Sequence, residues 1–386
     1  MELHVPFFVP CITDDDVEAV VKALRSRWLT GGPLAPEFER LFAEYIGAKY
    51  AVSVSSCTAA LHLVMRALEI RPGDEVIVPV LTFAATANAP LFCGARPVLA
   101  EIDEKTFNVS PDDIQNKITT KTKAIIVVHY AGQPCDMKRI TELADDYKIP
   151  LVEDCAHSLG AQFSGRQTGT LGIAGCFSFY ATKNITAAEG GMVTTNDREL
   201  AMRARQLREH GMTKSAAERE TGRTWYYDVV DLGYNYRLNE IQAALGISQL
   251  KRINEVNNRR IQAANCYYEE LFGVKGIQTP LVAEDRTHVF HLYVIRVLKE
   301  RYGLSRDELF DYLTARGIGL SVHYTPIHLL QFYRTILGNK LGDFPIAEKI
   351  HREILSLPLF PTITKDQINY VSAKIKEACG HQRQSK

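Results

Sequence analysis

The chain has 386 residues, enough for two or three domains of ordinary size or for one large domain with a smaller companion. Hydrophobic residues make up 46% and charged residues 23%, which excludes disordered and collagen-like chains. Lys plus Arg and Asp plus Glu each number 45, so no net charge attracts nucleic acid or anionic lipid. The composition predicts a soluble globular protein that holds charged ligands with local groups.

The eight cysteines are scattered and form no Cys-x-x-Cys pair. This spacing predicts buried free thiols in a reducing cytosol and neither a disulfide framework nor a metal site. The segment 1–14 has no basic start followed by an apolar run, so no signal peptide is expected. A charge-free stretch between Glu75 and Arg96 contains Pro79 and Pro90, which favours a buried strand followed by a helix over a membrane span.

Short apolar runs alternate with segments of helical period along the first part of the chain, a pattern typical of a mainly parallel sheet covered by helices. The expected strands are Ala51–Ser55, Val76–Val80, Arg96–Ile102, Ala124–His129, Pro150–Glu153, Gly175–Tyr180 and Gly191–Thr194. Thr13 before three aspartates and Ser110 before Pro111 predict helix starts. These signals agree on an α/β core.

After about Leu232, the alternation of short apolar runs and helical segments gives way to a long helical stretch. A long helical stretch is expected over Asn239–Leu271, and it leads out of the first domain. Strands are expected at Thr287–Leu298 and Ile318–Tyr324, with a helix between them whose start carries the capping pair Ser305 and Glu308. We therefore expect a large domain at residues 1–250 and a smaller α+β domain at residues 251–386.

Two charged residues follow strands that read as buried. Asp154 comes directly after the expected strand Pro150–Glu153, and in an open parallel sheet such a strand end lines the ligand crevice. A cap on the next helix would explain Asp154 equally well. Lys183 follows the aromatic strand 175–180, where loss of water would lower its pKa and make it a nucleophilic amine.

A lysine together with a carboxylate indicates pyridoxal phosphate, which needs a Schiff-base lysine, an acid at the ring nitrogen, an aromatic ring over its face and a phosphate site. The segment 55–62 follows a strand and opens a helix, so its N–H groups suit a phosphate. Ser178 adds a hydroxyl, and Phe83 either stacks on the ring or belongs to the core.

With these residues in place, the chain resembles the sugar-nucleotide aminotransferases of the DegT/StrS family. The matching segments are 29–33, 56–61, 82–88, 129–132, 153–157, 178–191, 233–239 and 322–324. The resemblance implies the aspartate-aminotransferase fold (fold type I), with an α/β large domain built on a mainly parallel sheet and a smaller α+β C-terminal domain. It also implies a homodimer with shared active sites.

The resemblance assigns Lys183 as the Schiff-base lysine and proton carrier, and Asp154 as the partner of the pyridine nitrogen. The other cofactor residues that it implies are Cys57, Thr58, Phe83, His157, Ser178 and, from the neighbouring subunit, Asn235. Near the sugar nucleotide it places Thr30, Asn184, Glu189, Arg237, His323 and Tyr324. Purely structural roles for Arg237, His323 and Tyr324 stay open.

The identity of residue 183 bears on the reaction, because relatives that dehydrate sugars carry histidine there. The segment 183–191 is most similar to enzymes that aminate C4 of a UDP-linked keto sugar. We therefore expect transfer of an amino group from L-glutamate to the C4 keto group of a nucleotide-linked, UDP-type sugar in the cytoplasm. The alternatives are C3 amination of a dTDP- or UDP-keto sugar, amination of a keto cyclitol, or a regulator that binds pyridoxal phosphate without turnover.

Overall fold

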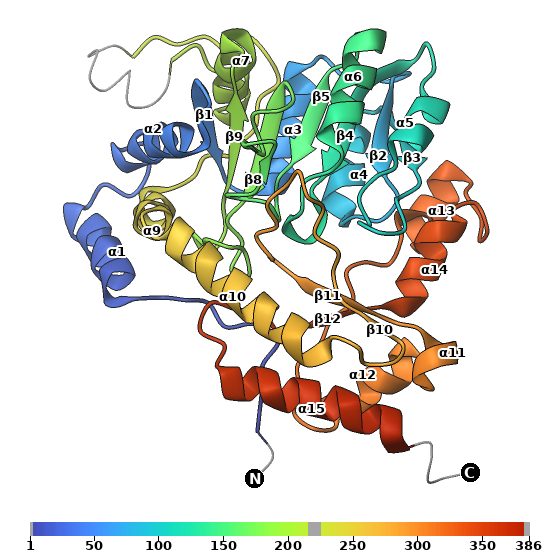
Figure 1. Ribbon diagram of the computed structural model, residues 1–386. Helices are drawn as coiled ribbons and strands as arrows, with labels where there is room; N and C mark the ends of the chain where they lie inside the picture. Colours follow the sequence, from blue (N-terminus) through green and yellow to red (C-terminus); the bar gives the residue numbers. More distant parts are fainter. Residues whose placement is uncertain (1–2, 215–224, 382–386) are drawn as a thin grey trace.

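The computed structural model describes residues 3–214 and 225–381. Its main feature is a seven-stranded sheet in the order β1-β9-β8-β5-β4-β2-β3 (Figure 1). The strands are β1 (Tyr50–Val54), β2 (Glu75–Pro79), β3 (Arg96–Ala100), β4 (Thr122–Val128), β5 (Leu151–Asp154), β8 (Ala174–Ser178) and β9 (Gly191–Thr195). All neighbours are parallel except β9, which is antiparallel to β1 and β8. The predicted α/β class is confirmed.

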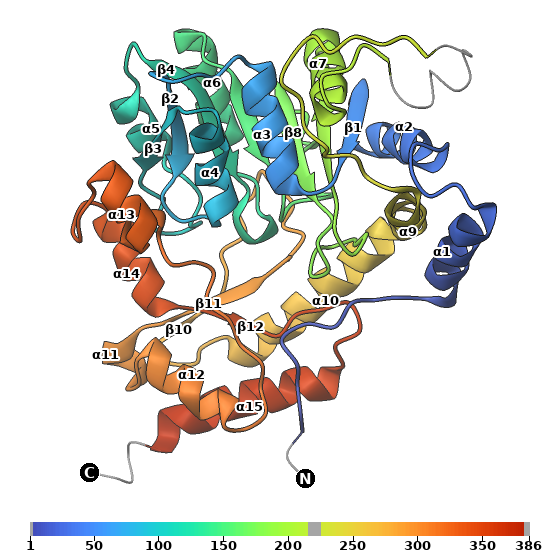
Figure 2. The same cartoon turned by 180° about the vertical axis from the view of Figure 1, so that it is seen from behind.

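The strands are apolar because both faces of the sheet are covered. In β4, Ala124 and Ile126 pack into one hydrophobic cluster, while Ile125 and Val127 pack into another on the opposite face. Helices α5 (Pro111–Lys117) and α6 (Met137–Tyr147) cover one face (Figure 1), and α3 (Cys57–Ala67), α4 (Ala84–Phe92) and α7 (Arg198–Arg208) cover the other (Figure 2). Burial on both sides explains the unbroken runs of Val and Ile.

The helices begin where the capping residues predict. Thr13 forms a capping box with Asp16 at α1 (Asp14–Ser26), and the Ser110 hydroxyl accepts the Asp113 N–H at α5. Ser305 and Glu308 form the same box at α12 (Arg306–Thr314). Helices α2 (Leu34–Ile46) and α9 (Glu240–Leu250) pack beside β1 and contribute to a third cluster.

A second, smaller assembly lies below the sheet in both views (Figures 1 and 2). It contains the antiparallel strands β10 (Ile277–Gln278), β11 (Tyr293–Val297) and β12 (Ile354–Leu357). Its helices are α10 (Ile253–Leu271), α11 (Lys299–Tyr302), α12, α13 (Gln331–Leu337), α14 (Pro345–Glu353) and α15 (Lys365–His381). Short elements complete the chain: β6 (Gln162–Phe163), β7 (Arg166–Gln167) and the 3-10 turns η1 (Tyr130–Gly132) and η2 (Ile327–Leu329). Within the described ranges, no helix has the length and apolar character that crossing a membrane requires.

Three local expectations differ from the structure. The long helix is divided into α9 and α10, and Arg252 at the junction forms a 2.7 Å ion pair with Asp16. Of the strand expected at 287–298, only β11 is paired, and the segment 318–324 makes isolated bridges at Ile318 and Ser321. The residue that bridges Ile318 is Val5, so the start of the chain packs with the second assembly although it precedes the first.

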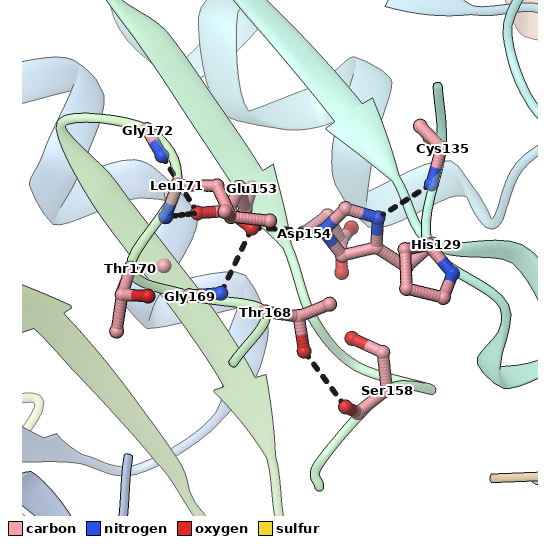
Figure 3. A network of polar contacts seen from close by, with 12 residues as sticks. His129, Cys135, Glu153, Asp154, Ser158, Thr168, Gly169, Thr170, Leu171 and Gly172 are labelled. Carbon is pink, nitrogen blue, oxygen red and sulfur yellow. Dashed lines mark hydrogen bonds and ion pairs between the residues drawn. The ribbon is translucent and has the colours of Figure 1, made fainter. Parts of the chain in front are cut away.

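A polar network fixes the end of β5, where the site begins (Figure 3). The buried Glu153 carboxylate accepts the backbone N–H groups of Leu171 and Gly172 on Oε1 and of Gly169 on Oε2, at 2.7–2.8 Å. His129 accepts the Cys135 N–H on Nδ1, so its Nε2 carries the hydrogen that Glu153 accepts at 2.9 Å. Glu153 therefore has four donors and holds the turn 169–172 against β5.

His129, Glu153 and Cys155 lie close enough together to suggest a metal site. However, Glu153 already accepts four hydrogen bonds and both His129 nitrogens are engaged. A carboxylate offers about four lone-pair positions. The group is therefore explained as a structural hydrogen-bond network, and we assign it no metal.

We expect Glu153→Gln to destabilise the protein, because an amide NH2 would face N–H donors that a carboxylate accepts. Each buried donor left unpaired costs about 1–3 kcal/mol, so the free energy of unfolding should fall by about 2 kcal/mol or more. Urea unfolding of the apoprotein measures the change. The matched control is Glu44→Gln on the surface, which should stay within about 0.5 kcal/mol of wild type. Equal stability of the two variants would contradict the role given to Glu153.

Candidate active site

A cavity of about 560 Å³ lies where the carboxyl ends of β5 and β8 face the second assembly. Open parallel sheets bind ligands at this edge. The sheet side is lined by residues of the loops that follow β1, β2, β5 and β8. The opposite side is lined by Phe7, Phe8, His291, Leu292, His323, Tyr324, Leu357 and Leu359.

Asp154 is buried at the end of β5 with 5% of its surface exposed. Its Oδ2 accepts the Thr86 hydroxyl at 2.8 Å, and its Oδ1 accepts the Ala156 N–H at 3.1 Å. Among the described residues, no Lys, Arg or His nitrogen lies within ion-pair distance of this carboxylate. Burial raises the pKa of Asp154, against the opposing effects of Thr86, Ala156 and Lys183. The carboxylate thus lacks a cationic partner.

Lys183 follows β8 and lines the same cavity. Desolvation lowers its pKa to about 8, although the charges of Cys57 and Asp154 oppose this shift. Its Nζ lies 3.5 Å from His291 Nε2. A lysine with a pKa near 8 has a substantial amine fraction at neutral and mildly alkaline pH, as a nucleophile requires.

His157 presents a defined hydrogen-bond donor to the cavity. The Ala131 N–H donates to its Nδ1 at 3.3 Å, so Nε2 carries the hydrogen. This Nε2 lies 3.0 Å from the Tyr324 hydroxyl, which accepts from it. Burial holds the pKa of His157 well below its usual value, so the ring is neutral. Tyr324 takes this N–H, so an oxygen placed in the cavity beside the ring would receive it only in place of the Tyr324 hydroxyl.

The start of α3 supplies further donors. Ser56 caps the helix by accepting the Ala59 N–H at 3.1 Å. The N–H groups of Cys57 and Thr58 have no acceptor among the described residues, and both residues line the cavity. Gly191 permits this arrangement, since a Cβ there would lie 2.5 Å from the Ser56 carbonyl carbon. Free N–H groups at a helix start bind phosphate.

These observations fit pyridoxal phosphate. The unpaired Asp154 would hold a protonated ring nitrogen, the His157 N–H suits the phenolic oxygen, and the start of α3 with Ser178 suits the phosphate. Phe83 is 60% exposed and lines the cavity, so its ring is available for stacking. The residues present therefore match each part of the cofactor.

The cavity gathers most of the residues that the sequence predicts for the site. It is lined by Cys57, Thr58, Phe83, Asp154, His157, Ser178, Lys183, Glu189, His323 and Tyr324. Asn184 is buried beneath the cavity and does not line it, because its amide donates to Asn257 Oδ1 at 2.7 Å. The structure thus gives Asn184 a hydrogen bond within the protein, and its expected contact with the sugar nucleotide stays a prediction.

Thr30, Asn235 and Arg237 lie outside the cavity, near the start of α9. The loop that carries Thr30 joins α9 through the Glu240 N–H, which donates to the Leu29 carbonyl at 3.0 Å. Asn235 is exposed, whereas its neighbours Tyr234 and Tyr236 turn inward with their rings stacked at 5.0 Å. The cavity therefore contains none of the three.

Several residues that line the cavity, or hold a residue that lines it, carried no signal in the sequence. Thr86 lies within a family-like segment, but only the structure shows that its hydroxyl holds Asp154. Phe7 and Phe8 reach the cavity because the N-terminal segment packs with the second assembly. His291 is a buried residue just before β11, and nothing in the sequence around it distinguishes it from a histidine of the core.

Known proteins resemble this chain over almost its whole length. The family model of the DegT/DnrJ/EryC1/StrS aminotransferases matches residues 10–376. The chain belongs to this family. It is similar to the spore coat polysaccharide biosynthesis protein SpsC of Bacillus subtilis, with 41% identity over 374 residues that cover 96% of each chain.

Solved structures agree with this assignment. The putative sugar aminotransferase Spr1654 of Streptococcus pneumoniae, in its PMP form, has a TM-score of 0.92 and 32% identity over the full length of both chains. PseC of Helicobacter pylori, an aminotransferase involved in the biosynthesis of pseudoaminic acid, has a TM-score of 0.91 and 30% identity over 98% of this chain and 100% of PseC. This protein is thus a sugar aminotransferase that depends on pyridoxal phosphate, with the predicted aspartate-aminotransferase-like fold.

We expect Asp154→Asn to stabilise the apoprotein at neutral pH. The folded state raises the pKa of Asp154 above its unfolded value, so the ionised carboxylate disfavours folding once the pH exceeds both values. Asparagine is compatible with the site: its oxygen can accept from Ala156, and its NH2 can donate to Thr86, which can turn its own hydroxyl to Thr82.

Thermal unfolding of both proteins as a function of pH measures this effect. The advantage of the variant should vanish below a pH of about 4, where the carboxyl is protonated in both states. A variant less stable than wild type at neutral pH would contradict the account of an unpaired charge.

Proposed function

We propose that the enzyme transfers the amino group of L-glutamate to the C4 keto group of a nucleotide-linked sugar, with UDP as the nucleotide. One observation supports the reaction type above all others. Lys183 and Asp154, a carboxylate without a cationic partner, line the same cavity. The similarity of segment 183–191 to the C4 enzymes supports the position of attack. SpsC and PseC, whose names refer to polysaccharide and pseudoaminic-acid biosynthesis, support an amino sugar as the product class.

The residues of the chain divide the work. Bound pyridoxal phosphate supplies an electron-accepting ring that stabilises negative charge on the substrate carbon. Asp154 would hold the protonated ring nitrogen, and His157 would meet the phenolic oxygen with the N–H that Tyr324 takes in this structure. Lys183, with a pKa near 8, would hold the cofactor covalently and, as a free amine, would move a proton between carbons.

We propose that the functional form is a cytoplasmic homodimer in which Asn235 serves the neighbouring site. Its side chain is exposed and lies outside the cavity of its own subunit. Arg237 and Thr30 lie on the same side, so the three would reach the second site together, where Thr30 and Arg237 would meet the sugar nucleotide. The eight free cysteines support a reducing compartment.

A keto-sugar panel tests the substrate. The purified enzyme, with its cofactor in the pyridoxamine form, is mixed with UDP-, dTDP- and GDP-linked 4-keto and 3-keto sugars and with a keto cyclitol. Absorbance follows the return of the cofactor to its aldehyde form. A UDP-4-keto sugar should react fastest, and Lys183→Ala should react with none. Preference for a 3-keto sugar or the cyclitol would overturn the proposed substrate, and absence of any reaction would overturn turnover itself.

Mixed dimers test the shared site. Lys183→Ala and Asn235→Ala proteins are each assayed alone and after co-refolding, at a cofactor concentration that loads wild type but not Asn235→Ala. If Asn235 serves the partner, each heterodimer holds one site with neither lesion, and random mixing restores about one quarter of wild-type activity. If Asn235 acts within its own subunit, every site keeps a lesion and no activity returns.

A further inference from the structure

The imidazole of His291 lies beside the reactive lysine and has no other polar partner among the residues that the structure describes. Its ring is 6% exposed, lines the cavity and lies with Nε2 3.5 Å from Lys183 Nζ. Its Nδ1 is buried and bonds to no group in the described ranges. Buried polar groups are usually hydrogen-bonded, so the contact with Lys183 is the one polar interaction that explains this imidazole.

The backbone around His291 is held firmly. Arg260 on α10 is fully buried and donates from Nη1 to the carbonyls of Phe290, His291 and Leu359 at 3.1–3.4 Å. The Val289 N–H donates to the Gly132 carbonyl, and the Leu292 N–H donates to the Ala131 carbonyl. Both sides of the residue are therefore tied to neighbouring elements, and the ring sits on a rigid support.

The charge state defines which group donates. Burial holds the pKa of His291 well below its usual value, and Lys183, His157, Arg260 and His323 act in the same direction, so the ring is neutral. An ammonium group only donates hydrogen bonds. When Lys183 is protonated, His291 Nε2 can therefore only accept. When Lys183 is a free amine, it can donate one N–H to His291 Nε2. The lone pair of the lysine nitrogen then points away from His291.

We propose that His291 is a positioning residue for Lys183: its Nε2 accepts one N–H and aims the remaining side of the amine into the cavity. The inference rests on the proposed role of Lys183 as the group that attacks the cofactor. The other ionisable groups that act on Lys183 are Cys57, Asp154 and Arg260, none of which is altered by a change at residue 291.

The first test uses the apoprotein and needs no turnover. Competitive acetylation with acetic anhydride across neutral and alkaline pH, read by peptide mass spectrometry, gives the pKa of Lys183. In His291→Phe the ammonium loses its acceptor, so this pKa should fall by about one unit. His291→Gln keeps an acceptor oxygen and should stay near wild type.

His288→Phe is the matched control. His288 is a buried histidine three residues earlier that does not line the cavity, and its Nδ1 accepts only the Phe290 N–H. Its replacement should leave the pKa of Lys183 unchanged. If His291→Phe fails to fold, His291→Asn replaces it, because the shorter amide does not reach Lys183. A Lys183 pKa that is the same in His291→Phe, or in His291→Asn where that replaces it, as in the control would overturn the inference.

The second test uses the loaded enzyme. His291→Phe should convert bound cofactor to its amine form about ten- to a hundred-fold more slowly at saturating glutamate, with little change in the glutamate concentration for half-saturation. An unchanged rate would also overturn the inference. Borohydride fixation of the cofactor at Lys183 in the same variant distinguishes the role of Lys183 from the role of His291. If the rate is unchanged and fixation persists, the proposed role of Lys183 stands and the positioning role of His291 is wrong.

Discussion

The site depends on a carboxylate that is buried without a cation. Removing an ion from water costs several kcal/mol, and one hydroxyl, one N–H and the Cys57 thiol at 3.9 Å do not replace the lost hydration of Asp154. The fold keeps the charge because β5 lies in the middle of the sheet, where both neighbouring strands hold it. A protonated pyridine nitrogen would supply the missing partner, so pairing with Asp154 would contribute to affinity for the cofactor.

The neighbouring acid shows the opposite solution. Glu153 points to the other face of β5, as alternation along a strand requires, and there it receives four hydrogen bonds. One carboxylate is satisfied by the protein and holds the turn that precedes β8. The other is left unsatisfied toward the cavity. Glu153 thus has a structural role and Asp154 a chemical one. The hydrogen bonds of Glu153 also fix the position of Asp154.

Much of this follows from local sequence. The seven strands were predictable because burial on both faces demands unbroken apolar runs, and the helix starts were predictable because capping uses adjacent residues. Asp154 and Lys183 could be chosen because one ends such a strand and the other soon follows one. That Glu153 is fully hydrogen-bonded while Asp154 lacks a cationic partner could not be predicted from sequence, since the groups that contact them are up to 97 residues away in the chain.

The remaining differences arise from long-range packing. Residues 318–324 read as a strand but meet only Val5 and Ser356 in single bridges. Asn184 follows the reactive lysine in the chain, yet contacts on α10 turn its side chain into the core. His291 is placed by Arg260 and by backbone contacts with η1, none of which leaves a local pattern.

The central claim is that Asp154 keeps the ring nitrogen of the cofactor protonated. Nuclear magnetic resonance of enzyme loaded with pyridoxal phosphate labelled with nitrogen-15 in the ring observes this nitrogen directly. The account predicts a protonated nitrogen in wild type at a pH where the free cofactor has lost that proton, and an unprotonated one in Asp154→Asn. An unprotonated ring nitrogen in the wild-type enzyme would contradict the account.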